Sequence, residues 1–462
     1  MKHLLSLPIM FFAMINIAFA QQPKVYFENS VMTNFMQPDW SFINYSENQK
    51  EILAFYRNLD NKTFYLSRFD TEFNVKTQSE IKMKSTSSKT STILNVHENG
   101  SQIHVITEEG NDIIHYTFNY DNLQNTDKEI LFTNTTHSPG KIATEVSWSA
   151  NGEYMAVVAC DNRSEHDPLK YTNFNYYIYL YDKDIHLLNH IQFPYMQYKV
   201  ACNKFCRPTW TITDNGEVVY AALHYTPTPK KIPEFGVSGC KIEARVITKD
   251  NCKIYEVPNI SSGGCLWNYL TYATGNIAKY DGEKMLVFFA NVLFQYDLKN
   301  NTAKSLCRFD IYIGANTSTG LSNYIDDGNG GFIMNRGRIF VWIKKDPLES
   351  YWRSWGNSTV QQGNAMFFPR YDAYSSEATF LHERKLYHID NVDNAGFASK
   401  KYRATQLVYY DENGNYDVIN ITSDAKNDLS FHHLSGSRYL IWEPNVKIGE
   451  QYRQRLGFFE FK

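Results

Sequence analysis

Thirteen histidines are the residues of this sequence most able to carry acid–base or metal chemistry. Three of them, His97, His104 and His115, fall on three successive predicted strands, where neighbouring strands bring side chains on one face together. Imidazole nitrogens are common metal ligands, so this spacing is compatible with a metal site. The alternative is a set of solvated or core-edge histidines. The sequence favours that alternative, and we expect no metal or other cofactor.

Motifs of several well-known enzyme classes are missing from the sequence. It contains no G-x-S-x-G nucleophile motif, no H-E-x-x-H zinc motif, no phosphate-binding loop and no dinucleotide fingerprint. The net charge of −3 comes from 46 Lys+Arg and 49 Asp+Glu without long charged blocks, which argues against a nucleic-acid partner. We therefore predict a binding protein rather than an enzyme, with a protein or a glycan as its partner.

Short runs rich in Tyr, Phe, Val and Ile, separated by Asn, Asp and Gly, predict β-strands along the whole chain. The clearest unit runs from Glu145 to Asp182 and continues through Ile191. It has a strand with Trp148, a turn at Asn151-Gly152, the strand Y-M-A-V-V-A-C, a loop, the strand Y-Y-I-Y-L-Y-D and a weaker fourth strand. This pattern predicts four antiparallel strands.

The same unit recurs along the chain. Its first turn is predicted near Asn48, Gly100, Gly152, Gly216, Gly282, Gly328, Glu377 and Gly436. Four-stranded units of roughly 40 to 60 residues, repeated in this way, are typical of β-propellers. We predict an all-β chain that folds as a single β-propeller of eight four-stranded antiparallel blades. Seven blades are the alternative, because the boundary between the units near Gly328 and Glu377 is poorly marked.

The two ends of the chain suggest how the ring closes. After Gly436 only the strands R-Y-L-I-W and L-G-F-F-E-F appear, so the last unit lacks its fourth, outermost strand. An extra strand, K-V-Y-F-E at residues 24–28, precedes the first unit. We predict that this N-terminal strand joins the C-terminal blade, which removes an open sheet edge.

One stretch resembles a known repeat. V-S-W-S-A-N-G-E-Y-M-A-V-V-A-C-D followed by Y-I-Y-L-Y-D is similar to the TolB-type (PD40, WD40-like) propeller repeat, roughly W-S-x-D-G-x-x-h-A-h and then I-Y-x-x-D, with h apolar. Asn151 stands where the repeat usually has Asp. The resemblance implies a propeller fold and selects no function, since relatives include protein-docking platforms, peptidase lids and polysaccharide lyases.

Long connections indicate where such a propeller would bind its partner. In a propeller, connections from second to third strand share one face, and four of them are long here, at residues 161–171, 224–235, 389–403 and 443–455. We predict that this loop-rich face and the central funnel bind the partner. Its polar candidates are Asp161, Arg163, His166, His224, Lys230, Asp393, Lys400, Arg403 and Arg453. Two alternatives remain: variable solvated loops without a ligand, and a carbohydrate-active lyase or hydrolase with acids or histidines gathered in the funnel.

The first twenty residues have the pattern of a secretory signal peptide. Lys2 and His3 precede an apolar stretch, and Ala18-Phe19-Ala20 matches the small-x-small cleavage pattern. An uncleaved membrane anchor is the alternative. We expect cleavage after residue 20, a propeller domain over residues 21–462, and a secreted monomer (periplasmic in a bacterium) without membrane insertion.

Cysteines and glycosylation sequons are consistent with export. The seven cysteines lie between Cys160 and Cys307, and an exported protein favours disulfides, with Cys202–Cys206 as the predicted local pair. Cys240 and Cys252 bracket one predicted strand and are therefore too far apart to pair. Asn-x-Ser/Thr sequons favour glycosylation, an Asn-rich bacterial protein being the alternative. They begin at Asn44, Asn61, Asn99, Asn134, Asn162, Asn259, Asn300, Asn316, Asn357 and Asn420.

Overall fold

The computed structural model is built from β-strands. It describes residues 24–32, 38–46, 50–58, 63–70, 74–83, 91–133, 142–161, 172–197, 209–225, 240–260, 276–289, 292–310, 321–326, 332–336, 339–343, 351–354, 360–362, 365–369, 375–382, 385–393, 403–410, 416–422, 430–435, 438–448 and 451–460. Within these ranges there are 34 strands and no helix. Accordingly, the described residues contain no helix that could cross a membrane.

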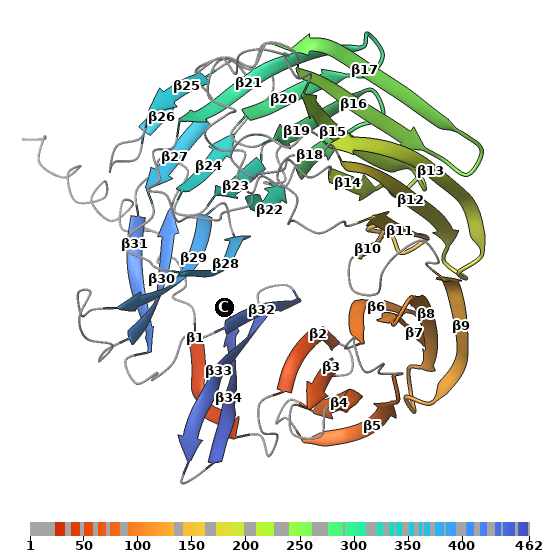
Figure 1. Ribbon diagram of the computed structural model, residues 1–462. Helices are drawn as coiled ribbons and strands as arrows, with labels where there is room; N and C mark the ends of the chain where they lie inside the picture. Colours follow the sequence, from red (N-terminus) through yellow and green to blue (C-terminus); the bar gives the residue numbers. More distant parts are fainter. Residues whose placement is uncertain are drawn as a thin grey trace, which may run out of the picture.

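The first half of the chain forms four sheets, each with four antiparallel strands in chain order (Figure 1). The first contains β2 (Pro38–Ser46), β3 (Glu51–Asn58), β4 (Phe64–Asp70) and β5 (Val75–Ile81). The second contains β6 (Thr92–Asn99), β7 (Gln102–Glu109), β8 (Asp112–Asn119) and β9 (Asn125–Thr133). The third contains β10 (Ile142–Trp148), β11 (Tyr154–Asp161), β12 (Thr172–Asp182) and β13 (Leu187–Gln197). The fourth contains β14 (Thr209–Ile212), β15 (Val218–Tyr225), β16 (Cys240–Ile247) and β17 (Cys252–Ile260).

Two sheets of the second half have a fifth strand, which the four-stranded repeat does not predict. One contains β18 (Asn276–Tyr280), β19 (Lys284–Phe289), β20 (Val292–Asp297), β21 (Thr302–Asp310) and β25 (Tyr351–Ser354). The other contains, in spatial order, β22 (Leu321–Asp326), β23 (Phe332–Arg336), β24 (Ile339–Ile343), β27 (Ala365–Pro369) and β26 (Val360–Gln362). Strand β25 pairs in parallel with β21, and β26 extends the next sheet through β27. The poorly marked unit boundary in the sequence lies in this region.

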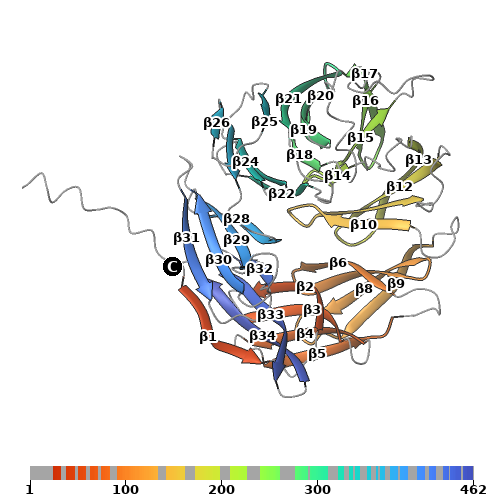
Figure 2. The same cartoon turned by 60° about the vertical axis from the view of Figure 1, so that its left-hand side comes forward.

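The last two sheets return to four strands. One contains β28 (Ser375–His382), β29 (Lys385–Asp393), β30 (Arg403–Tyr410) and β31 (Tyr416–Thr422). The other contains β32 (Ser430–Ser435), β33 (Arg438–Ile448), β34 (Gln451–Glu460) and β1 (Lys24–Met32). Strand β1 pairs antiparallel with β34, with Val25 opposite Phe459, and the two strands lie side by side in both views (Figures 1 and 2).

The sheets follow one another around a common centre. In Figure 1, the first strand of each sheet lies nearest the centre and the later strands lie toward the perimeter. Four of the eight predicted first turns, at Gly100, Gly152, Gly216 and Gly282, fall in described turns between the first two strands of a sheet. Asn48, Gly328 and Gly436 lie outside the described residues, at sequence positions between the first two strands of their sheets. The prediction at Glu377 is wrong, because this residue lies within β28 and the hairpin closes between His382 and Lys385. Neither residue between that pair, Glu383 or Arg384, is a typical turn former.

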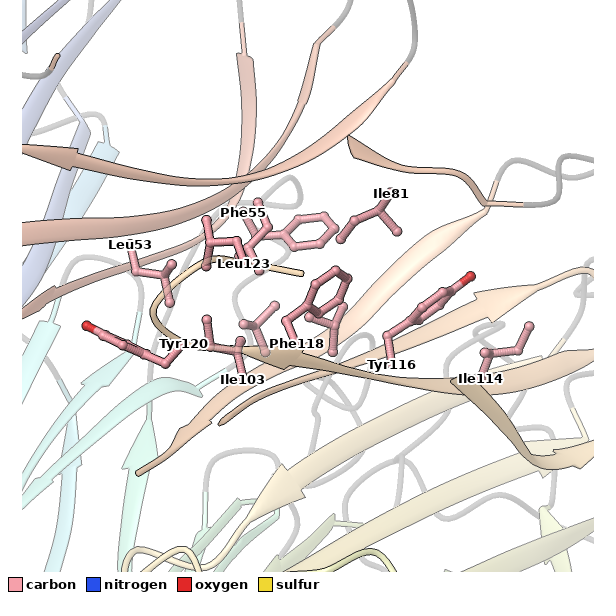
Figure 3. Packing of buried hydrophobic residues seen from close by; sticks show 12 residues of the cluster. Leu53, Phe55, Ile81, Ile103, Ile114, Tyr116, Phe118, Tyr120 and Leu123 are labelled. Carbon is pink, nitrogen blue, oxygen red and sulfur yellow. The ribbon is translucent and has the colours of Figure 1, made fainter. Parts of the chain in front are cut away.

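Buried side chains fill the spaces between neighbouring sheets. Because side chains alternate across a strand, Ile103 and Val105 of β7 face the β2–β5 sheet, whereas His104 and Ile106 face the β10–β13 sheet. The first of these spaces holds a large apolar cluster that includes Phe55 and Phe118 (Figure 3). The sheets therefore pack face to face, and each interface has its own composition.

Candidate functional site

Five of the nine predicted binding residues lie on described strands. Asp161 ends β11, His224 is the penultimate residue of β15, and Asp393 ends β29. Arg403 begins β30 and is the register partner of Asp393, so the structure places these two residues opposite each other on neighbouring strands. Arg453 lies in β34 opposite Val446. The remaining four, Arg163, His166, Lys230 and Lys400, lie outside the described residues.

All four predicted loops begin on a strand: 161–171 overlaps β11 by one residue, 224–235 overlaps β15 by two, and the other two need larger corrections. Residues 443–448 and 451–455 belong to β33 and β34, which pair as far as Ile448 and Gln451, so the predicted loop 443–455 is a strand hairpin. Residues 389–393 likewise belong to β29. The apparent loops contain charged and amide side chains, but exposed strands tolerate these side chains at solvent-facing positions.

The other sequence predictions about export lie largely outside what the structure describes. Residues 1–20 and the Cys202–Cys206 pair fall outside the described ranges. Among described side chains, Cys252 is a free thiol, and burial raises its pKa while Arg245 opposes this effect. Cys240 begins β16 and Cys252 lies beyond its other end, opposite Ile247, which agrees with the predicted separation of the two residues.

One group of side chains in the described part of the chain brings three metal-ligand atoms close together: Asp182, Asp184 and His186. These residues form the turn between β12 and β13. The Asp182 carboxylate accepts hydrogen bonds from the backbone N–H of Asp184 at 3.0 Å and of His186 at 2.8 Å, and its second oxygen lies 3.1 Å from His186 Nδ1. Asn119 and Asp297 accept backbone N–H bonds in the equivalent hairpins of other sheets. The carboxylate at Asp182 is thus explained as a turn cap.

His97, His104 and His115 do meet across their strands, as the spacing predicts, but they do not bring three ligand atoms together. His104 Nδ1 lies 2.9 Å from His115 Nε2, and His115 Nδ1 lies 2.9 Å from Glu129 Oε1. His97 is the register partner of His104 on β6. The three rings and Glu129 therefore form a row that crosses the β6–β9 sheet from its inner to its outer strand.

The hydrogen bonds of this row have one consistent direction. A carboxylate only accepts, so His115 Nδ1 carries the proton that Glu129 accepts. The neutral His115 ring then accepts at Nε2, and His104 donates from Nδ1. His104 Nε2 is consequently a lone pair, and it is buried without a hydrogen-bond partner. The hydroxyl of Thr117 lies 3.4 Å from His115 Nε2.

Burial favours the neutral form of the three imidazole rings. His104 and His115 are each only 3% exposed. Burial, with the neighbouring imidazoles of His115 and His97, lowers the pKa of His104 to about 4. Burial also lowers the pKa of His115, although its hydrogen bond to Glu129 acts in the opposite direction, and burial lowers the pKa of His97.

The β10–β13 sheet covers the row. The indole of Trp148 stacks on His97 with ring centroids 4.1 Å apart and lies 5.5 Å from His104. Gly152, in the turn between β10 and β11, also lies against His97. It adopts φ +73°, and a Cβ added there would lie 3.1 Å from His97 Nε2. The glycine thus allows this turn to approach the histidine closely.

Glu129 as a member of this row and Trp148 as the residue that covers it were not predicted from the sequence. The signal was present in strand alternation: His104 and Ile106 share one face of β7, and His115 lies opposite both Ile106 and Glu129. The sequence does not show which face of the β10–β13 sheet packs on the histidine row. This packing decides whether Trp148 contacts the row.

Comparison with known proteins supplies no family. No family model matches the sequence, and no curated protein matches it. Among solved structures, the WD40 domain of SCAP from fission yeast aligns over 94% of this chain and 98% of its own at 11% identity, with a TM-score of 0.43. The β-propeller domain of the Trilobed protease from Pyrococcus furiosus aligns over 84% and 97% at 10% identity (TM-score 0.37). Hsv2 from Kluyveromyces lactis aligns over 83% and 98% at 9% identity (TM-score 0.40). The first two of these are a WD40 domain and a β-propeller domain, and neither supports the TolB-type repeat in particular.

Proposed function

We propose that this protein is an exported β-propeller of eight blades that binds a protein or a glycan through one face. The observation that supports this most is the position of its four elongated connections. Three join the second and third strands of their sheets, β11 to β12, β15 to β16 and β29 to β30, and the extended β33–β34 hairpin occupies the same position. In a propeller, connections at this position leave the blades on one face, so together they would form one surface.

Eight blades follow from taking each of the eight sheets as one blade. The pairing of β1 with β34 supports closure of the ring, because the first strand of the chain then completes the last sheet. The propeller domain would span residues 21–462, after removal of residues 1–20 as a signal peptide, and would act as a secreted monomer. Ala18-Phe19-Ala20 supports this cleavage.

Charge at the strand ends supports a polar binding surface. Asp393 ends β29 and Arg403 begins β30, on either side of a long connection, and the two residues are register partners. His224 lies opposite Lys241 at the corresponding end of β15 and β16. Opposite charges and other polar residues gathered at one end of the sheets would give specificity for polar partners such as glycans or charged protein surfaces.

A glycan array and a variant pair on each face test the proposal. We expect Asp393→Ala/Arg403→Ala to weaken binding of any glycan captured by the wild type by roughly tenfold, about 1.4 kcal/mol. The matched control is Lys183→Ala/Asp250→Ala, in exposed turns after β12 and β16 at the opposite ends of the sheets, and it should leave binding within about twofold. Equal loss in both variants would refute the assignment of the face. Cleavage of a bound polysaccharide would instead support the lyase or hydrolase alternative.

A further inference from the structure

The buried imidazole pair between the β6–β9 and β10–β13 sheets has a feature that packing alone does not require. Apolar side chains alone could fill the space between these two sheets. On the opposite face of the β6–β9 sheet, buried apolar residues do fill the space toward the β2–β5 sheet. Instead, the structure buries two titratable rings at 3% exposure, joined by one hydrogen bond of 2.9 Å. Such a pair is stable only in one protonation state.

The hydrogen-bond direction leaves the pair no place for an additional proton. His115 already donates to Glu129 and accepts from His104, and His104 Nε2 faces no acceptor. A proton on His104 Nε2 would create a buried N–H without a partner and a positive charge beside a second imidazole. A proton on His115 Nε2 would direct two donors at each other, unless the His104 proton moved from Nδ1 to Nε2, where it would have no partner. Either outcome disfavours the closed interface.

The surroundings compensate a positive charge on His115 from one side only, and no acid among the described residues acts on His104. From β9, Glu129 and Asp127 act on His115, and they are the acids nearest to the pair. On β6 lies His97, a further base, and Glu108 shares the face of β7 beyond Ile106. From β12, Tyr181 and Tyr179 face the interface, and burial raises the pKa of both, so they remain neutral. From β13, His190 stacks on Tyr179, and burial lowers its pKa. Strands β10 and β11 contribute only Val146, Trp148, Met155 and Val157 to the apolar cluster here, none of which is ionisable.

We propose that the His104–His115 pair is an acid-sensitive part of this interface: its neutral form allows the β6–β9 sheet to pack on Trp148 and the β10–β13 sheet, and acidification increases the small fraction of molecules in which the two sheets have opened. Opening hydrates both rings, which then take up a proton as ordinary histidines do. Trp148 loses its stacking on His97 at the same time. The inference concerns this interface alone and does not depend on the proposed partner.

Hydrogen–deuterium exchange of the full chain at pH 7.0 and pH 5.5, corrected for intrinsic exchange, tests the proposal. Peptides covering β7–β8 and β10–β11 should exchange about eightfold faster at pH 5.5, the ratio for one group whose pKa rises from about 4 to 6.5 on opening. A peptide covering β3, on the other interface of the β6–β9 sheet, should show no comparable increase. Uniform acceleration across both interfaces would overturn the proposal.

Variants distinguish a titrating pair from a merely structural one. His104→Gln/His115→Gln should remove most of the increase at pH 5.5, leaving only the response of His97, whereas His186→Gln, whose side chain is 76% exposed, should retain it in full. An undiminished acid response in the double variant contradicts the proposal. If the double variant does not fold, His104→Gln alone serves, since it leaves the His115–Glu129 hydrogen bond in place, and an unchanged acid response in it would be equally contradictory.

Discussion

The two faces of the β6–β9 sheet are packed against its neighbours by different means. Toward the β2–β5 sheet, Phe55, Ile103 and Phe118 belong to a cluster of twelve buried apolar residues. An ion cluster borders it, in which Arg68 and Lys76 bind Glu51 and Arg68 also donates to the backbone oxygens of Tyr120 and Asp121. Toward the β10–β13 sheet, the cluster of buried apolar residues has six members, and the histidine row lies beside it.

The difference shows how one sheet can combine a stable interface with a condition-dependent one. Apolar burial does not depend on pH, and the Glu51 ion cluster responds only to strong acid. Burial opposes ionisation of Glu51, but hydrogen bonds from Lys76 and Arg68 outweigh it and lower the pKa of this carboxyl. Its contribution is therefore complete above pH ~4.5 and is lost as the pH falls below that value. The histidine row responds at milder pH.

Phe118→Ala should have the largest effect, because it removes a fully buried ring from the apolar interface. We expect the free energy of unfolding to fall by about 3–5 kcal/mol, the usual cost of deleting a buried aromatic ring. Urea unfolding at pH 7.0 and 5.5 would measure it. The loss should be the same at both values, and Ile254→Ala, at a position 54% exposed, should change little. A strongly pH-dependent loss would argue that the apolar face also titrates.

Glu51→Gln should lower the free energy of unfolding slightly less than Phe118→Ala does. The substitution leaves the guanidinium of Arg68, 12% exposed, without its carboxylate, and breaking a buried ion pair in this way typically costs about 3 kcal/mol. Urea unfolding should show an equal cost at pH 7.0 and 5.5, because Glu51 remains ionised at both. An unchanged free energy of unfolding in Glu51→Gln would mean that the backbone oxygens of Tyr120 and Asp121 are sufficient to hold Arg68.

His104→Gln should change the pH dependence of stability rather than its value at one pH. The folded-state pKa of His104 lies below the unfolded value, so the folded protein binds fewer protons. Its contribution is complete above pH ~6.5 and is lost as the pH falls toward about 4. The stability difference between wild type and variant should therefore shift by about 2 kcal/mol in favour of the variant between pH 7 and pH 5. A constant difference in urea unfolding would contradict the assignment of a depressed pKa to this ring.

The smallest predicted effect is the difference in stability between alanine variants of two turn glycines. Gly100 lies in the β6–β9 sheet, and Gly152 lies in the β10–β13 sheet that packs on it. A Cβ added at Gly100 (φ +59°) would have no heavy atom within 4 Å, whereas a Cβ added at Gly152 (φ +73°) would lie 3.1 Å from His97 Nε2. Both alanine variants incur the left-handed backbone cost of about 1 kcal/mol. Gly152→Ala should lose about 1 kcal/mol more, because His97 must move. Equal midpoints in thermal unfolding would show that this approach is not tight.

Much of the fold could be predicted from the sequence, because turn chemistry and strand alternation are local. Asn99-Gly100, Asn151-Gly152 and Asn215-Gly216 mark hairpins whose glycines have positive φ. The hairpin between His382 and Lys385 was misplaced because no Gly or Asn marks it. Strands β25 and β26 were missed because their pairing joins segments distant in sequence or adds to a sheet edge, which local pattern does not reveal.

The candidate site was less predictable for the same reason. The sequence shows that His97, His104 and His115 lie on successive strands, but a metal site and a hydrogen-bonded row need the same spacing. Which one forms depends on Glu129 and on the packing of Trp148 from the next sheet. The extended β33–β34 hairpin was predicted as a loop because polar residues suit exposed strands as well as loops.

The tautomers of the buried histidines, observed through their ring nitrogens, test most directly whether the row is neutral and hydrogen-bonded in one direction. Long-range ¹H–¹⁵N spectra of ¹⁵N-histidine-labelled protein at pH 7, assigned with His104→Gln and His115→Gln, report which ring nitrogen carries the proton. We predict that both rings are neutral and protonated at Nδ1, with bare Nε2 atoms, and that His104 stays neutral down to pH 5. Protonation at Nε2, or titration of His104 near pH 6.5, would contradict this prediction.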